Sequence, residues 1–276
     1  MIRDIAIHIT GSSEDATRIA YAGQLATMLD AHVTALVESI IPEPQVTFTT
    51  AVGAEIAQQI AESARSETHR LVSVVKEKLA ASGLSHEVRP VAAYPGGISE
   101  ALAAQVRTSD LFVGTRPYGD PTGMTNIEEA ALFRSGRPCF FAPPQGTPPR
   151  SYSRVLVAWK ETREAARAVA DALPLLARAG EVVVALIEEH GASERFREEA
   201  GADIGRYLSR HGVSADIHKI TGWDYAPSAI LNEVERVQPE LIVMGGYGHS
   251  RFREWVLGGA TRDILSSAKV PVLMAH

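Results

Sequence analysis

Cysteine, long apolar runs and excess positive charge are all scarce in this chain of 276 residues. Its single cysteine, Cys139, leaves no internal disulfide possible. No apolar run approaches the roughly 18–20 residues that a membrane-spanning helix requires. The first residues, Met1 to Asp4, do not begin the apolar core of a signal peptide. Together these absences predict a cytoplasmic protein that does not span a membrane.

The chain also lacks the short motifs of the common enzyme classes. No Gly-Lys pair occurs, which excludes a Walker P-loop, and neither a dinucleotide Gly-x-Gly-x-x-Gly after a first strand nor a Gly-x-Ser-x-Gly elbow is present. The nine histidines show no metal-ligand spacing. A net charge of −6 argues against general nucleic-acid binding, because such proteins are usually basic. We therefore favour a binding or signalling protein over an enzyme.

The most informative segment that is present lies at residues 241–275. An apolar run leads into a glycine turn, and two further glycines precede a helical pattern: Leu241–Met244, then Gly245, Gly246 and Gly248, then Gly258 and Gly259. Glycines let the main chain approach a ligand, and the N–H groups at a helix start favour an anion. The segment is interpreted as a phosphate cradle, or as a loop whose glycines serve turn geometry alone.

The spacing Gly245-x-x-Gly248, nine residues, Gly258 resembles the nucleotide motif of the universal stress protein family, which is Gly-x-x-Gly, nine residues, then Gly-Ser or Gly-Thr. The resemblance continues through Thr261 and into the apolar run that ends at Leu273. It implies a five-stranded, doubly wound α/β domain of the adenine nucleotide alpha hydrolase-like type. It also implies an adenine nucleotide as ligand, with Mg²⁺ if that nucleotide is ATP.

The order of expected elements occurs twice. Alternating strands and helices predict βαβ units and a parallel sheet whose ligand site lies at the carboxyl ends of strands one and four. In the first half the expected strands are Ile5–Ile9, His32–Val37, His86–Pro90, Leu111–Gly114 and Pro138–Ala142, and the helices are Glu14–Leu29, 53–82 and Ile98–Val106. In the second half the strands are Val155–Trp159, Val182–Ile187, Ala215–Ile220, Leu241–Met244 and Pro271–Ala275, and the helices are Thr162–Arg178, 192–212 and Pro227–Val237.

A proline-rich stretch between the halves cannot continue a helix or a central strand. We therefore predict two tandem domains, residues 1–144 and 151–276, joined by a linker at 145–150. Family members pair the fifth strands of two domains, and apolar sheet edges are usually covered. The resemblance thus implies that the two halves form an internal pseudo-dimer; further assembly as a homodimer stays open.

The first half lacks the glycines of the motif. Aligned on the last strand, Thr125 stands where Gly258 stands. Aligned on the fourth strand, residues 115–118 include no glycine, and Pro117 removes a main-chain donor that a phosphate would need. We predict that this half is a degenerate copy whose cleft stays empty. Its extra segment, Ile40–Thr50, is interpreted as a surface loop, with a lid over a cleft as the alternative.

The second half departs from the family pattern at two positions. Nucleotide-binding members carry an aspartate after the first strand, and Lys160 stands there, a cation that cannot accept hydrogen bonds. Lys160 is interpreted as a solvated lysine, with a phosphate contact as the alternative. Gly259 replaces the Ser or Thr after the last motif glycine, so a hydroxyl contact to phosphate is lost. The resemblance places the nucleotide against Ala158, Lys160, Ile187, Met244, Gly245, Gly248, Gly258, Gly259, Ala260 and Thr261.

Other candidate side chains favour structural roles. His249 and Ser250 lie beside the motif without the acidic partner of a triad, and His218 is expected to be a structural histidine. Cys139 is expected in the core, where free cysteine behaves as a small hydrophobe. Three hypotheses follow: a stress protein that binds an adenine nucleotide in its second half, one that works through protein contacts without nucleotide, and a slow ATP hydrolase.

Overall fold

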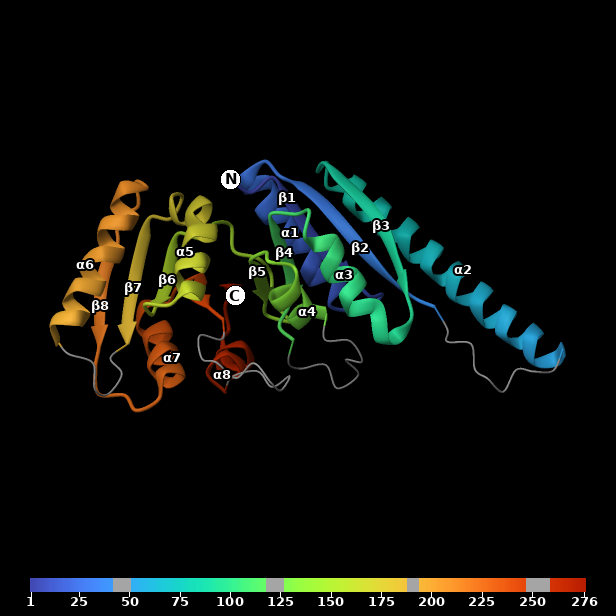
Figure 1. Cartoon of the computed structure of the whole chain (residues 1–276). Coiled ribbons are helices and arrows are strands. Elements are labelled where there is room, and N and C mark those ends of the chain that lie inside the picture. The colour runs from blue at the N-terminus through green and yellow to red at the C-terminus, as the bar shows by residue number, and fades with distance from the viewer. Residues whose placement is uncertain (42–50, 118–126, 188–193, 247–258) are drawn as a thin grey trace. The chain divides into compact units, whose positions relative to one another are not determined.

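The protein is described by a computed structural model that covers residues 1–41, 51–117, 127–187, 194–246 and 259–276 (Figure 1). At 51–54, 194–200 and 259–260 it describes the backbone alone. The chain divides into two compact units. Unit 1 comprises Met1–Arg137 with Gln145–Thr147, and unit 2 comprises Pro138–Pro144 with Pro148–His276.

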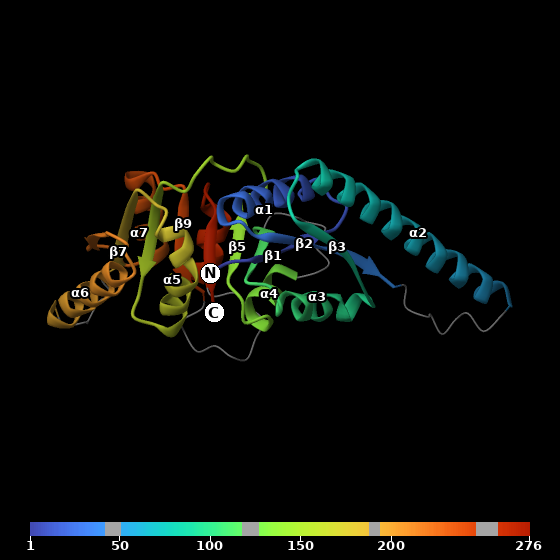
Figure 2. The same ribbon diagram turned by 90° about the horizontal axis from the view of Figure 1, so that it is seen from above.

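Unit 1 contains four parallel strands in the order β3-β2-β1-β4. The strands are β1 (Asp4–Ile9), β2 (His32–Ile40), β3 (His86–Ala93) and β4 (Leu111–Thr115). The helices are α1 (Asp15–Leu29), α2 (Ala51–Ala81), α3 (Ile98–Val106) and α4 (Ile127–Arg134), and a 3₁₀ turn, η1 (Pro95–Gly97), precedes α3. Figure 2 shows α1 and α2 on one face of these strands and α3 and α4 on the other. Covered faces explain why β4 is buried along its whole length.

Unit 2 contains six strands in the order β5-β10-β9-β6-β7-β8, and all but β5 are parallel. The strands are β5 (Cys139–Ala142), β6 (Arg154–Trp159), β7 (Glu181–Ile187), β8 (Asp216–Ile220), β9 (Leu241–Gly245) and β10 (Val272–Ala275). The helices are α5 (Arg163–Leu176), α6 (Glu194–Arg210), α7 (Ala226–Val237) and α8 (Gly259–Ser267). Right-handed crossovers put α5 and α6 on one side of the sheet and α7 and α8 on the other.

The edge strand of unit 2 comes from the first half of the sequence. β5 runs antiparallel to β10, with Phe141 opposite Val272 and Cys139 opposite Met274. All the residues of both strands are buried. The predicted pairing of the two fifth strands is therefore confirmed, as is the core position of Cys139.

The expected strands and helices are present with small differences at their ends. β2 continues to Ile40, so the predicted surface loop cannot begin there; its residues 42–50 lie outside the described part of the chain. The structure adds α4, a short helix that the sequence patterns did not predict. The structure confirms the predicted α/β fold with a largely parallel sheet. The domain boundaries 1–144 and 151–276 stay a prediction, because the compact units assign Pro138–Pro144 to unit 2.

Candidate functional site

Three of the predicted site residues lie together at the carboxyl ends of the strands of unit 2. Ala158 on β6 pairs with Met244 on β9, and Ile187 ends the neighbouring strand β7, two residues beyond the partner of Ala158. Ala158 and Met244 are buried, with 8% and 7% of their surface exposed, and we call these two residues together with the half-buried Ile187 the apolar floor. A floor of this kind suits the flat, apolar face of a ligand.

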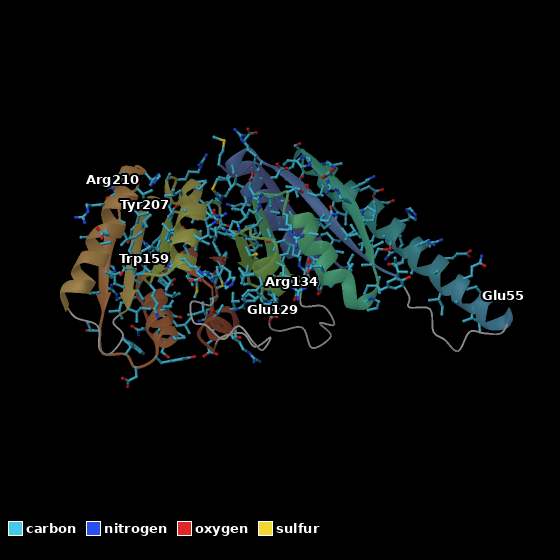
Figure 3. The ribbon with its side chains drawn as sticks, viewed as in Figure 1. Glu55, Glu129, Arg134, Trp159, Tyr207 and Arg210 are labelled. Carbon is cyan, nitrogen blue, oxygen red and sulfur yellow. The ribbon has the colours of Figure 1, made fainter. Side chains whose placement is uncertain are left out.

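The side of the sheet on which this floor lies follows from Gly245. A Cβ atom at Gly245 would point at the start of α5, so Met244, its neighbour in the strand, faces the opposite side, where α7 and α8 pack. Ala158 and Ile187 share the face of Met244 by strand register. Trp159, which Figure 3 labels, therefore faces the α5 side, and its buried indole Nε1 has no hydrogen-bond partner among the described residues.

α8 supplies the helix start that the motif predicts. It begins at Gly259, so the backbone of Gly259, Ala260 and Thr261 forms its first turn, where N–H groups are free of partners within the helix. Thr261 is buried, with 4% of its surface exposed. Gly248 and Gly258, the other two motif glycines, lie outside the described residues, as do His249 and Ser250 beside them.

Gly245 has a packing role of its own. A Cβ atom there would lie 2.5 Å from the backbone nitrogen of Ala165 and 2.8 Å from the carbonyl carbon of Glu164. These atoms belong to the first turn of α5, which Thr162 caps by accepting a hydrogen bond from the Ala165 N–H. The glycine therefore lets α5 lie directly against β9, a reason for glycine that involves no ligand.

Lys160 follows β6 in the turn to α5, and its side chain is exposed. Its carbonyl oxygen accepts a hydrogen bond of 2.7 Å from the Thr162 N–H, which closes the turn. The exposure agrees with the interpretation of Lys160 as a solvated lysine. With a lysine at position 160, the chain has no carboxylate where the resemblance expects one.

The matching positions of unit 1 hold charged side chains. Strand registers and the alignment on the last strand give four correspondences: His8 with Ala158, Glu38 with Ile187, Thr115 with Gly245, and Glu128 with Thr261. His8, Thr115 and Glu128 are buried, and the Glu38 side chain is 10% exposed. Where unit 2 has an apolar floor, unit 1 thus has a buried polar cluster.

His8 is the centre of this cluster. Its Nε2 lies 3.0 Å from Oε2 of Glu38, and its Nδ1 lies 3.6 Å from Oε1 of Glu128. Burial alone would lower the pKa of His8, but the Glu128 and Glu38 carboxylates outweigh it and raise the pKa above its ordinary value of 6.5. Burial would likewise raise the pKa of Glu128, yet His8 and Arg18 hold it below the ordinary range.

Arg18 of α1 is the second cation of the cluster. Its guanidinium lies 3.1 Å from both Glu14 and Asp15 and 3.5 Å from Glu128, and it donates a hydrogen bond of 2.9 Å to the Thr115 hydroxyl. The Thr115 hydroxyl in turn donates to Glu14. Among the described residues, four carboxylates therefore face two cations, and the cluster is negative even when His8 is protonated.

Sequence patterns did not predict this cluster, although one signal was present. His8 is the polar residue inside the apolar run Ile5–Ile9. A histidine in a strand that is buried on both faces needs polar partners. His218, by contrast, pairs with a single carboxylate: its Nδ1 lies 2.7 Å from Oε1 of Glu233, as expected for a structural histidine.

The described residues contain no group of three or more His, Cys, Asp or Glu side chains placed to hold a metal ion. No helix in the same part of the chain is both long and apolar enough to cross a bilayer.

Comparisons with known proteins agree with this fold. The family model of the universal stress protein family matches residues 151–276. A universal stress protein of Synechocystis sp. is 32% identical over 78 residues, a match that spans 27% of this chain and 26% of that relative's length. The family model thus assigns residues 151–276, a little under half of the chain, to the universal stress protein family.

Solved structures resemble the chain over nearly its whole length. A universal stress protein from Archaeoglobus fulgidus has a TM-score of 0.69 at 18% identity, with 98% of this chain and 95% of that chain covered. A functionally unknown protein from Pseudomonas aeruginosa has a TM-score of 0.63 at 14% identity, with 99% and 92% covered. At these identities the likeness shows the α/β fold alone.

Proposed function

We propose that the protein is a tandem universal stress protein of the cytoplasm that binds an adenine nucleotide in its C-terminal half and acts by binding or signalling. The observation that carries this proposal is the apolar floor of Ala158, Ile187 and Met244, on the side of the sheet where α8 packs. Apolar side chains beside main-chain donors match a nucleotide, whose base is flat and whose phosphates are anionic.

Within this site the residues have separate roles. The base would lie on Ala158, Ile187 and Met244, and the phosphates would face the main-chain N–H groups that begin α8 at Gly259, Ala260 and Thr261. Gly248 and Gly258 belong to the site by their spacing. The described site residues include no carboxylates for a metal. Mg²⁺ would accompany ATP, and the phosphates would supply its oxygen ligands.

The described residues of unit 1 offer a phosphate no equivalent site. Its cluster fills the matching positions with side chains and carries an excess of negative charge, which repels an anion. Together with Pro117 and the missing glycines, this supports the prediction that the first half binds no nucleotide. The two-domain division at 145–150 and the internal pseudo-dimer form part of the same proposal.

Two substitutions test the site by titration calorimetry with ATP and Mg²⁺. Gly258→Val brings two methyl groups to the phosphate-facing main chain, and Thr261→Glu copies the carboxylate that unit 1 has at this position. Each is expected to weaken binding by about 2–3 kcal/mol, the scale of one or two charge-assisted hydrogen bonds.

Matched controls are Thr261→Ser and, in unit 1, Thr125→Val at the position equivalent to Gly258; both should leave the affinity unchanged. Wild-type protein that binds no ATP, ADP or AMP would instead favour the stress protein that works through protein contacts. Turnover of added ATP by the purified protein would favour the slow hydrolase. Equal affinities of wild type and both site variants would contradict the proposal that this segment binds phosphate.

A further prediction concerns base selectivity. Because Lys160 replaces the carboxylate that recognises adenine in nucleotide-binding members, wild-type protein should discriminate poorly between ATP and GTP. Lys160→Asp should raise the preference for ATP by about five- to tenfold, the value of one hydrogen bond. Competition binding with ATP, GTP and ribose 5-phosphate measures this preference.

Lys219→Asp, the same charge change at an exposed position of β8, is the control and should not alter selectivity. If Lys160→Asp weakens binding of all three competitors alike, Lys160 serves a phosphate. A wild-type protein that already prefers ATP strongly would contradict the assignment of this position.

A further inference from the structure

We propose that His8 is a proton-operated clamp in unit 1, whose imidazolium form ties the first turn of α4 to the ends of β1 and β2. The proposal is independent of nucleotide binding, because it concerns only the charged cluster of unit 1. It starts from one geometric fact: the two ring nitrogens of a single buried histidine face carboxylates from two different elements.

The number of protons on the ring decides whether both contacts are attractive. Imidazolium has an N–H on each nitrogen, so Nε2 can donate to Glu38 while Nδ1 points its proton at Glu128. Neutral imidazole has one N–H, so one nitrogen must present a lone pair to a carboxylate. That contact is then repulsive, and its members are buried away from water that could replace the lost hydrogen bond.

The Nδ1 atom is the more responsive of the two. It is buried, and among the described residues it has no partner within hydrogen-bond distance, since Glu128 is 3.6 Å away. Glu128 belongs to the first turn of α4 and lies close to β4 because Gly114 has no side chain; a Cβ atom there would be 3.2 Å from Cγ of Glu128. A change of charge on His8 therefore acts on the attachment of α4.

The other charges around His8 reinforce this dependence. Glu38 reaches it from β2 and Glu128 from α4, while α1 contributes Arg18 with its partners Glu14 and Asp15. When His8 loses its proton, Arg18 remains as the one cation facing these four carboxylates within the described cluster. Because this guanidinium also pairs with Glu14 and Asp15, it cannot replace the imidazolium charge that Glu128 loses.

The direction of the pH effect follows from the raised pKa of His8. Stabilisation by imidazolium is complete below the ordinary value of 6.5 and is lost as the pH rises through the higher pKa of the folded state. The lowered pKa of Glu128 adds an acid limit, because its contribution is present above 4.5 and is lost as the pH falls through the lowered value. α4 is thus held at mildly acidic to neutral pH and released in alkali.

Hydrogen exchange of the full chain tests the clamp. After correction for the intrinsic pH dependence of exchange, protection of the α4 amides should fall as the pH rises above the ordinary His8 value of 6.5, by about tenfold for each unit by which folding raises the pKa of His8. His8→Gln should show no such fall. His218→Gln is the matched control in unit 2, because His218 also pairs with a glutamate, and it should behave as wild type.

A second measurement needs no variant at His8. The imidazole resonances of wild-type protein, followed by NMR, should show His8 titrating above its ordinary value, and Glu38→Gln should lower that pKa. The clamp is overturned if His8 titrates at or below the ordinary value, if α4 protection in wild type does not change with pH, or if His8→Gln retains the wild-type pH dependence.

Discussion

Replacing Arg18 with methionine is expected to destabilise unit 1 by about 3–5 kcal/mol, the cost of leaving a buried charge without its partner. Arg18 is 5% exposed and bonds to carboxylates and to the Thr115 hydroxyl. Methionine keeps much of the side-chain volume, so the loss measures charge and hydrogen bonding more than packing. Urea unfolding followed by circular dichroism should show the loss of stability.

The distribution of tryptophan separates the two units in this experiment. All three tryptophans, Trp159, Trp223 and Trp255, lie after residue 150. Fluorescence therefore reports on unit 2, whereas circular dichroism reports on the helices of both units. Arg18→Met should move the dichroism transition to lower urea and leave the fluorescence transition in place. A fluorescence shift of equal size would contradict the assignment of the effect to unit 1.

Arg70→Met provides the matched control. Arg70 pairs with Glu67 three residues earlier in a helix, as Arg18 pairs with Asp15, but its side chain and that of Glu67 are 67% and 62% exposed. Water solvates such a pair almost as well as the partner does. The control should show no measurable change, and a loss similar to that of Arg18→Met would show that burial is not the cause.

Gly245→Ala is expected to destabilise unit 2 by about 3 kcal/mol, the upper end for overpacking a core. The added methyl group would lie 2.5 Å from the backbone nitrogen of Ala165, and backbone atoms in a capped first turn cannot rotate away as a side chain can. The fluorescence transition in urea should therefore move to lower denaturant. Unchanged stability with lost nucleotide binding would show instead that Gly245 serves the ligand alone.

Gly180→Ala is the control for the same type of substitution in the same unit. A Cβ atom there would lie 3.6 Å from the Ser153 carbonyl oxygen, an ordinary contact, and Gly180 is not among the glycines with positive φ. Alanine at such a position restricts the unfolded chain, so stability should be unchanged or slightly increased.

The sequence predicted the strands well because a strand buried on both faces must be apolar throughout. Val155–Trp159 and Leu241–Met244 stand out as such runs and became β6 and β9. α4 was not predicted, since its eight residues offer too little periodicity to distinguish a helix. The pairing of β5 with β10 was predictable because two apolar edges in one chain need cover.

The candidate site was predictable only in part. The resemblance supplied Ala158, Ile187 and Met244, and the strand registers place them on one face. The packing role of Gly245 was not predictable, because it depends on how closely α5 approaches β9. The charged cluster was missed for a similar reason: His8, Glu38 and Glu128 are far apart in sequence and meet only when β1, β2 and α4 are assembled.

Because β5 from the first half of the sequence lies in unit 2, the chain itself keeps the edge of that sheet covered. Two separate domains would close this sheet edge by association, with a dependence on protein concentration. Here β5 and β10 belong to one polypeptide, so their pairing is intramolecular and does not depend on protein concentration. The edge therefore stays covered at any dilution, so the protein does not depend on its own abundance to keep that edge closed.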